Sequence, residues 1–166
     1  MAILPARGPQ GKWWVIGLFN WLDRPASDAI RLHEWIHISN EAIALSFWDG
    51  QLMESRAGIL DPPEIPAHGS ILLEVRPLED KAQYIGSDLH FSQGAEVAQW
   101  KVTRNELQAH LRLKREAEGN LWLALPGSPK KAAIDGTQIH PVHIQKNIWK
   151  FPVRFAGEGV LDIRWG

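Results

Sequence analysis

Residues 12–19 have the sequence Lys-Trp-Trp-Val-Ile-Gly-Leu-Phe, a run of aromatic and branched side chains that favours a β-strand. Apolar side chains occupy both faces of this run, with Trp14 and Ile16 on one face and Trp13 and Val15 on the other. A strand that is apolar on both faces is covered on both. We therefore expect one face to lie in a sandwich core and the other to dock against a loop, a second module or a partner.

Short strands separated by turn residues continue along the rest of the chain. Residues 70–76 and 106–113 alternate apolar and polar side chains, as half-buried strands do. Asp-Gly dipeptides at 49–50 and 135–136 predict hairpins. Further strands are expected at 41–49, 51–54, 97–103, 121–125, 131–134, 137–144, 148–155 and 160–165. This spacing predicts an all-β protein, an antiparallel β-sandwich of immunoglobulin-like or jelly-roll-like type in one or two modules.

A polar stretch interrupts this pattern near the middle of the chain. Residues 76–81 have the sequence Arg-Pro-Leu-Glu-Asp-Lys, and Pro77 disfavours a continuous strand. We therefore expect a β-sandwich module at residues 1–77 and a second β-rich module at residues 78–166, with one continuous sandwich as the alternative.

Residues 28–38 are compatible with two secondary structures. One or two helical turns would place Leu32 and Trp35 on the same side, whereas a strand would place His33, Trp35 and His37 on one face. Periodicity does not discriminate over so short a run. We favour a strand that leads into a turn.

Charge and composition argue against several classes of partner. The net charge is −1, and the most basic stretches are pairs at 114–115 and 130–131, so we expect no nucleic-acid partner. No apolar run approaches the length of a membrane-spanning helix, and residues 1–19 lack the pattern of a signal peptide. The chain has no cysteine, which fits a cytoplasmic location at least as well as secretion.

No pattern of a catalytic or metal site is present in the sequence. The G-x-S-x-G motif of serine hydrolases and the glycine-rich phosphate loops are absent. The acidic residues fall mostly in turns or on polar strand faces, where aspartate is expected for backbone reasons. The pairs His33/His37 and His140/His143 lack an accompanying H-E-x-x-H motif. We expect no catalytic residue, no metal and no cofactor.

Nine tryptophans are an unusual number for 166 residues. Tryptophan contributes a large buried area to a core, or a flat face on which a sugar ring can stack. We expect Trp149 and Trp165 to be core residues because they share strand faces with other apolar side chains. Trp35, Trp100 and Trp122 are expected to be partly exposed, and they are the candidates for binding a glycan by stacking.

Four segments resemble the region that follows the catalytic barrel in melibiase-type α-galactosidases. Gly-Leu-Phe-Asn-Trp at 17–21, followed by Asp-Arg-Pro at 23–25, is similar to the strand and turn directly after that barrel. The hairpin Phe-Trp-Asp-Gly at 47–50 and the segment 65–77 follow in the same order. Residues 84–94, Tyr-Ile-Gly-Ser-Asp-Leu-His-Phe-Ser-Gln-Gly, resemble a further β-region of larger relatives.

The resemblance implies an accessory role. The catalytic aspartates of that family lie on a (β/α)₈ barrel that precedes this region, and no position of this chain matches the barrel motifs. The expected function is therefore a non-catalytic β-sandwich that packs on a catalytic barrel, with this chain as the detached C-terminal part of a longer enzyme. A carbohydrate-binding module is the alternative. Expected partners are a barrel domain, a carbohydrate, or a second copy of the chain through an apolar surface.

Overall fold

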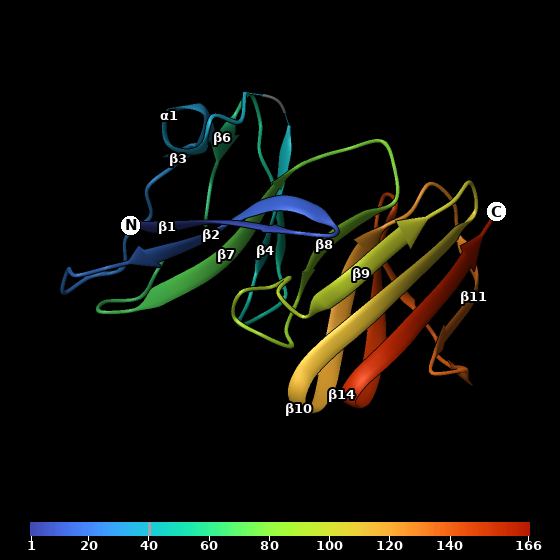
Figure 1. Cartoon of the computed structure of the whole chain (residues 1–166). Helices are drawn as coiled ribbons and strands as arrows, with labels where there is room; N and C mark the ends of the chain where they lie inside the picture. Colours follow the sequence, from blue (N-terminus) through green and yellow to red (C-terminus); the bar gives the residue numbers. More distant parts are fainter. Residues whose placement is uncertain (40) are drawn as a thin grey trace. The chain divides into compact units, whose positions relative to one another are not determined.

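The chain folds almost entirely into antiparallel β-sheets, which confirms the predicted all-β class (Figure 1). The computed structural model describes residues 1–39 and 41–166. Within these residues the single α-helix, α1 (Leu32–Ile36), is five residues long, and no helix has the length and apolarity needed to cross a membrane.

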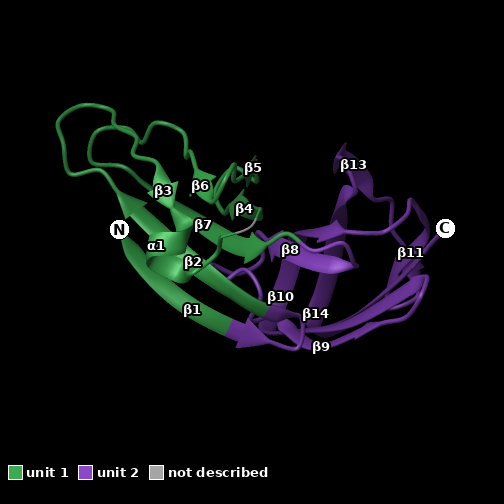
Figure 2. Cartoon of the chain, turned by 90° about the horizontal axis from the view of Figure 1, so that it is seen from above, with its two compact units in different colours: residues 1–6, 12–78 green, residues 7–11, 79–166 purple. Residues whose placement is uncertain are grey.

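Two compact units make up the chain (Figure 2). The first contains residues 1–6 and 12–78, and the second contains residues 7–11 and 79–166. The two units are defined by compactness alone. The division of the chain into two functional modules at residue 77 stays a prediction.

The first unit is built on a five-stranded sheet with the order β1-β2-β7-β4-β5. Its strands are β1 (Ala2–Gly8), β2 (Gly11–Phe19), β7 (Ser70–Pro77), β4 (Ala42–Ser46) and β5 (Leu52–Glu54). A small two-stranded sheet pairs β3 (Ile30–Arg31) with β6 (Ile59–Leu60). Ile16 and Leu73 of the large sheet share a core with Leu32 of α1 and Leu60 of β6. The helix and the small sheet therefore cover one face of the large sheet.

Both faces of β2 are buried within this chain. Ile16 lies in the core of the first unit, and Trp14 and Leu18 pack against that core. On the opposite face, Trp13 and Val15 are buried as well. The expectation that both faces of this strand are covered is therefore confirmed, and its exposed residues, Gly11, Lys12 and Phe19, lie at the two ends of the strand.

Residues 28–38 differ from the predicted strand. Two residues extend as β3, and the chain then turns into α1, where Leu32 and Ile36 point into the core. Their spacing of four residues puts them on one helical face, which burial against the sheet selects. Trp35 consequently faces away from the core and is exposed. Residues 2–8 also form a strand that the sequence pattern did not predict.

The second unit is built on one seven-stranded antiparallel sheet through which two long strands run. The strands are β8 (Gln83–Ser87), β9 (Val97–Val102), β10 (Glu106–Ala124), β11 (Pro129–Ile134), β12 (Thr137–Gln138), β13 (Val142–Gln145) and β14 (Ile148–Trp165). The first half of β10 pairs with β9 and with the end of β14. Its second half pairs with β8 and with the start of β14.

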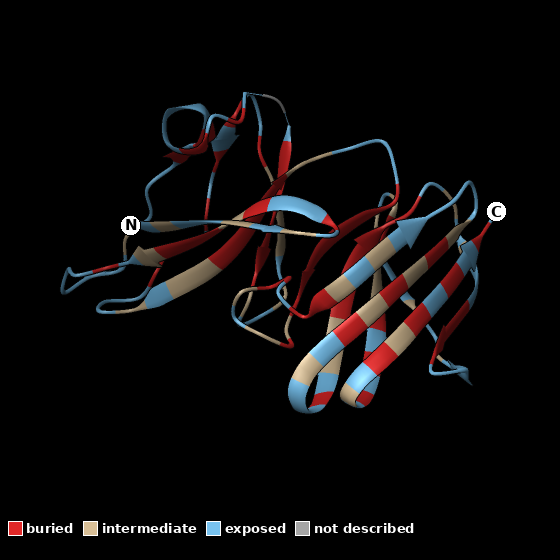
Figure 3. Ribbon diagram, viewed as in Figure 1, coloured by how far each residue is buried: buried red, intermediate tan, exposed pale blue. Residues whose placement is uncertain are grey.

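Each of these long strands was predicted as two. The strands expected at 106–113 and 121–125 are one strand, and so are those at 148–155 and 160–165. The pairing of β10 with β14 shifts register between Arg112 and Glu116, and an irregularity of this kind lets a pair of strands bend sharply. Buried side chains alternate with more exposed ones along most of β14 and along the start of β10, whereas the last four residues of β10 are all buried (Figure 3). The buried ones form the core, which includes Tyr84, Leu107, Leu111, Leu121, Leu123, Phe151, Val153, Phe155, Leu161, Ile163 and Trp165.

A close approach between β10 and the loop after β8 requires glycine at position 119. Asp88 accepts hydrogen bonds from the Asn120 backbone N–H at 2.6 Å and from Asn120 Nδ2 at 2.7 Å. A Cβ atom at Gly119 would collide with Asp88 Oδ1 and lie 2.9 Å from Leu89 Cδ2. The Asp88 carboxylate thus occupies the space that any larger residue at 119 would need.

We expect Gly119→Ala to lower the free energy of unfolding by about 1–3 kcal/mol, as overpacked sites do. Alanine in a strand is normally more stabilising than glycine by roughly 0.5–1 kcal/mol. A lower free energy of unfolding in Gly119→Ala would therefore be due to the collision with Asp88. Urea unfolding followed by circular dichroism measures it. In a double-mutant cycle with Asp88→Ala, the two losses should not add, because the second change removes the obstructing carboxylate. Additive losses, or a Gly119→Ala variant as stable as the parent, would contradict this account.

Candidate functional site

An aromatic groove lies on the first unit, where the end of β2 meets the segment that leads into α1. The groove has a volume of about 720 Å³, within the range of small-molecule sites. Its lining residues are Met1, Leu18, Phe19, Asn20, Trp21, Leu22, Ala26, Ser27, Asp28, Ala29, Ile30, Arg31, Glu34, Trp35 and Ile65. Hereafter we call it the aromatic groove.

Three aromatic side chains of the groove are open to solvent. Trp21 is 80% exposed, Trp35 is 57% exposed and Phe19 is 48% exposed. The rings of Phe19 and Trp21 are stacked, with centroids 6.1 Å apart and an angle of 18° between their planes. Contiguous exposed apolar patches are often sites of interaction. The groove therefore offers flat apolar faces to a ligand.

The turn that carries Trp21 is fixed by one buried amide. Asn20 Nδ2 lies within hydrogen-bond distance of three carbonyl oxygens: Arg24 at 2.8 Å, Ile65 at 2.9 Å and Pro66 at 3.0 Å. Asn20 Oδ1 accepts a hydrogen bond from the Leu22 N–H at 3.0 Å. These contacts join the turn after β2 to the segment before β7. The backbone on both sides of Trp21 is thus held although its side chain projects into solvent.

Polar groups line the groove beside the aromatic rings. Arg31 and Glu34 form a loose ion pair with 3.9 Å between Arg31 Nε and Glu34 Oε1. Ser27 Oγ donates a hydrogen bond to the Pro62 carbonyl at 2.7 Å, and Asp28 is exposed. Carboxylate and guanidinium groups at the edge of an aromatic surface can hydrogen-bond the hydroxyl groups of a sugar. The groove combines the two kinds of contact that glycan binding requires.

The three tryptophans predicted to bind sugar lie in different environments. Trp35 lines the aromatic groove. Trp100, on β9, packs against the core of the second unit, and its ring meets the edge of Tyr84 with centroids 5.9 Å apart. Trp122, on β10, is buried with 4% of its surface exposed, so the expectation that it is partly exposed is wrong. Of the three, Trp35 is the one that presents an open ring.

Sequence reasoning did not select Phe19 or Trp21 for the site. A usable signal was present, because Trp21 follows the strand directly and lies among the turn-forming residues 20–27. An aromatic side chain in a turn has no sheet face to bury it. The same reasoning applies to Trp48, which lies in the turn between β4 and β5 and is also exposed.

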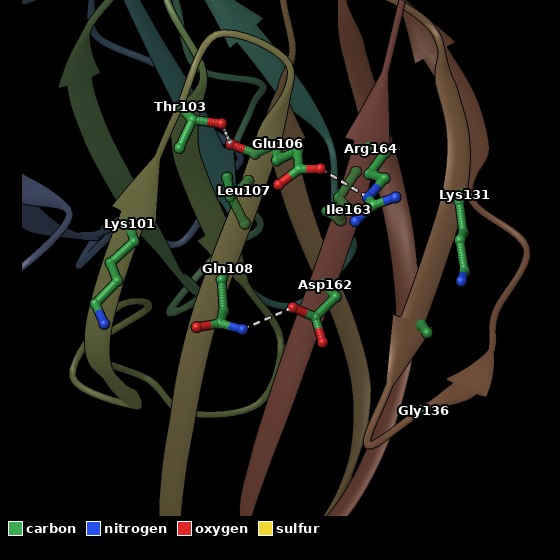
Figure 4. A pocket seen from close by; sticks show the side chains of 11 residues that line it. Lys101, Thr103, Glu106, Leu107, Gln108, Lys131, Gly136, Asp162, Ile163 and Arg164 are labelled. Atoms are coloured by element: carbon green, nitrogen blue, oxygen red, sulfur yellow. Dashed lines mark hydrogen bonds and ion pairs between the residues drawn. The ribbon is translucent and has the colours of Figure 1, made fainter.

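A second hollow, of about 500 Å³, lies on the polar face of the sheet in the second unit (Figure 4). Glu106 Oε1 pairs with Arg164 Nε at 2.8 Å, and Gln108 Nε2 donates to Asp162 Oδ1 at 2.9 Å. Such cross-strand pairs are typical of a solvated sheet face. No aromatic ring lines this hollow, and two of its charged side chains, Glu106 and Arg164, pair with each other. We therefore place the candidate site in the aromatic groove.

One serine lies close to a histidine in the second unit. His90 Nδ1 is 2.7 Å from Ser92 Oγ and also accepts the Ser92 backbone N–H at 3.2 Å. Ser92 Oγ in turn accepts the Ala95 N–H at 3.2 Å. These contacts close a tight turn. A catalytic serine would need a histidine oriented by a third group, and among the described residues the side-chain hydrogen bond of His90 is to Ser92 itself.

Within residues 1–39 and 41–166, no group of three or more His, Cys, Asp or Glu side chains could hold a metal ion. Neither His33/His37 nor His140/His143 is part of such a cluster.

Comparison with known proteins adds no family assignment. No protein-family model matches the chain, and no curated protein gives a significant match.

Proposed function

We propose that this chain is a non-catalytic accessory β-sandwich protein that binds a glycan in the aromatic groove of its first unit. The observation that carries the proposal is the solvent-exposed, stacked pair of Phe19 and Trp21 with Trp35 in the same groove. Sugar rings present a face of C–H groups that packs on aromatic rings, while their hydroxyl groups bind polar side chains. Asp28, Arg31 and Glu34 are placed to make those polar contacts.

The energetics of the groove favour a ligand over a purely structural role for its aromatic residues. An indole that is four-fifths exposed contributes little to folding, since hydrophobic stabilisation scales with the area removed from water. The Asn20 hydrogen bonds hold the surrounding backbone, so little ordering entropy would be lost on binding. Trp21 is thus presented for contact with another molecule.

A second candidate function uses the same surface. Phe19, Asn20 and Trp21 belong to the segment that resembles the strand and turn after the barrel of melibiase-type α-galactosidases. In this alternative, the aromatic groove packs on a catalytic (β/α)₈ barrel, and the chain is an accessory domain of an α-galactosidase-like glycoside hydrolase. The two candidates share the surface and differ in what covers it.

We expect Trp21→Ala to weaken glycan binding at least tenfold, which corresponds to about 1.4 kcal/mol. The substitution removes a stacking face while changing the stability by about 0.5 kcal/mol or less, as exposed substitutions do. A glycan array identifies the best ligand, with galactose-containing oligosaccharides included, and titration calorimetry with the full chain measures its affinity. Trp48→Ala is the matched control, because it removes an exposed tryptophan of the same unit outside the groove.

The outcomes separate the candidates. Equal loss in both variants, or full affinity in Trp21→Ala, would refute binding in the groove. If no glycan binds, and sedimentation analysis shows a complex with an α-galactosidase barrel that Trp21→Ala abolishes, the docking alternative holds. Hydrolysis of an aryl α-galactoside by the purified chain would contradict the non-catalytic part of the proposal.

A further inference from the structure

A buried carboxylate in the second unit lies outside the proposed glycan site. Glu96 belongs to the loop between β8 and β9 and has no exposed surface. Its Oε1 atom accepts hydrogen bonds from the hydroxyl groups of Tyr84 and Ser87. Its Oε2 atom is buried and has no hydrogen-bond partner within the described residues. Half of this carboxylate is therefore unsatisfied by the protein.

Two further buried side chains share this condition, one in the same loop as Glu96 and one hydrogen-bonded to that loop. Gln10 Nε2 donates a hydrogen bond to the carbonyl of Gly94 at 2.8 Å, while Gln10 Oε1 is buried without a partner. Gln93 has no exposed surface, and neither atom of its amide has a partner among the residues that the structure describes. Because Gln10 is anchored on Gly94, all three side chains gather around the four-residue segment 93–96.

The charge of this group is not compensated by the protein. Hydroxyl groups can solvate a carboxylate but do not neutralise it, and a buried charge is normally paired or bound to a cation. In the described part of the chain, no lysine, arginine or histidine forms an ion pair with Glu96. A positively charged ligand that is coordinated by oxygen atoms would neutralise the carboxylate and give its Oε2 atom a partner.

The geometry points to a site for a monovalent alkali cation at segment 93–96, with Glu96 Oε2, Gln93 Oε1 and Gln10 Oε1 as its protein ligands. Carboxylate and amide oxygens are donors for hard cations. One carboxylate balances one positive charge, so a monovalent ion leaves the buried site neutral, whereas a divalent ion would leave it positive. Remaining ligands would be backbone carbonyls or water.

The site connects segments that are far apart in sequence. Gln10 lies in the turn between β1 and β2, whereas Gln93 and Glu96 lie more than 80 residues later. The Glu96 carbonyl accepts the backbone N–H of Arg112 at 2.7 Å, which ties the same segment to β10. A cation bound there would stabilise the folded second unit, because a ligand that binds only the native state raises its stability.

Thermal unfolding of the full chain tests the site at constant ionic strength. Samples are exchanged into choline chloride and then titrated with sodium chloride or potassium chloride at the same total salt. We expect the melting temperature to rise by several degrees and to saturate with one of the two alkali ions, and the ion with the larger effect identifies the ligand. Equal melting temperatures in all three salts would refute the proposal, since a site filled by internal water would not distinguish them.

Two variants make the test specific. Glu96→Gln keeps an acceptor for Tyr84 and Ser87 but removes the charge, so the alkali response should disappear. Glu118→Gln changes an exposed glutamate of β10 and should retain it. An alkali response that survives in Glu96→Gln would overturn the assignment.

A measurement on the unmodified chain covers the case in which Glu96→Gln does not fold. Crystals soaked in rubidium or thallium salts should show an anomalous peak within about 3 Å of Glu96 Oε2, near the oxygen coordination distances of hard cations. Absence of that peak in ordered crystals would overturn the site. Glycan binding is measured independently, so failure here leaves the proposed function of the first unit unaffected.

Discussion

Arg76→Met should lower the free energy of unfolding by about 3–5 kcal/mol, the range for breaking one partner of a buried ion pair. Arg76 Nε donates a hydrogen bond to Glu74 Oε1 on β7, and both side chains are almost completely buried. The Arg76 guanidinium also lies 4.8 Å from the centre of the Trp13 ring. Removal of the arginine would leave the Glu74 carboxylate in the interior without its cation.

The loss should be reversed when the glutamate is removed as well. A buried ion pair replaced by apolar residues of similar size is often as stable as the original, because no charge is then taken out of water. We therefore expect Glu74→Leu combined with Arg76→Met to be within about 1 kcal/mol of the parent protein or more stable. Urea unfolding followed by tryptophan fluorescence compares the parent, the two single variants and the double variant.

A double variant less stable than either single variant would show that the pair is stabilising in itself. Arg154→Met provides the matched control. Arg154 Nη2 pairs with Glu116 Oε1 at 2.7 Å, but both side chains are exposed. Glu116 raises the pKa of Arg154 by a hydrogen bond and by its charge. Since solvent screens an exposed pair, loss of this arginine should have little effect on unfolding.

The position of this buried pair explains why the strands of the first unit could be predicted but their surroundings could not. Residues 70–76 alternate, and the alternation correctly predicted a strand. The same alternation places Glu74 and Arg76 on the polar face of the strand, which it predicts to be solvated. Burial of that face depends on contacts made elsewhere in the fold, which local periodicity does not contain.

The second unit shows a similar limit. Leu107 and Leu111 indicated a strand correctly, but residues 114–120 contain Ala117 as their only buried apolar side chain. This segment lies at the bend of β10 and faces solvent on most of its length, so its composition resembles that of a loop. Gly157, with a positive φ of 77°, marks the corresponding bend in β14.

The candidate site was accessible to sequence reasoning in part. Trp35 was correctly predicted to be exposed, but the residue was expected in a strand and lies in helix α1. The groove itself depends on long-range pairing. Ala26 pairs with Ile65, and Ile30 pairs with Leu60, which brings segments more than 25 residues apart to one place. Nothing in the local pattern specifies these partners.

Asn20→Ala should destabilise the protein by about 2–3 kcal/mol and also abolish glycan binding in the aromatic groove. The asparagine amide is buried, and its removal leaves the Arg24 carbonyl and the Leu22 N–H without this partner, while the Ile65 carbonyl keeps the Ala26 N–H at 3.1 Å. Each buried group left unsatisfied costs about 1–3 kcal/mol. The turn that presents Trp21 would lose its anchor, so the stacking face would no longer be held in place.

The conservative variant and a neighbouring control define what the asparagine does. Asn20→Asp keeps an acceptor for the Leu22 N–H but replaces the donor with an oxygen that faces carbonyl groups. We expect it to be at least as destabilised as Asn20→Ala, because a negatively charged carboxylate oxygen then faces partially negative carbonyl oxygens in a buried site. His68→Ala removes an exposed contact with Asp23 at 2.9 Å in the same region and should change stability by about 0.5 kcal/mol or less. Urea unfolding gives the stabilities, and calorimetry at a temperature where every variant is folded gives the glycan affinities. Full affinity in folded Asn20→Ala would show that Trp21 binds without this anchor and that the hydrogen bonds serve folding alone.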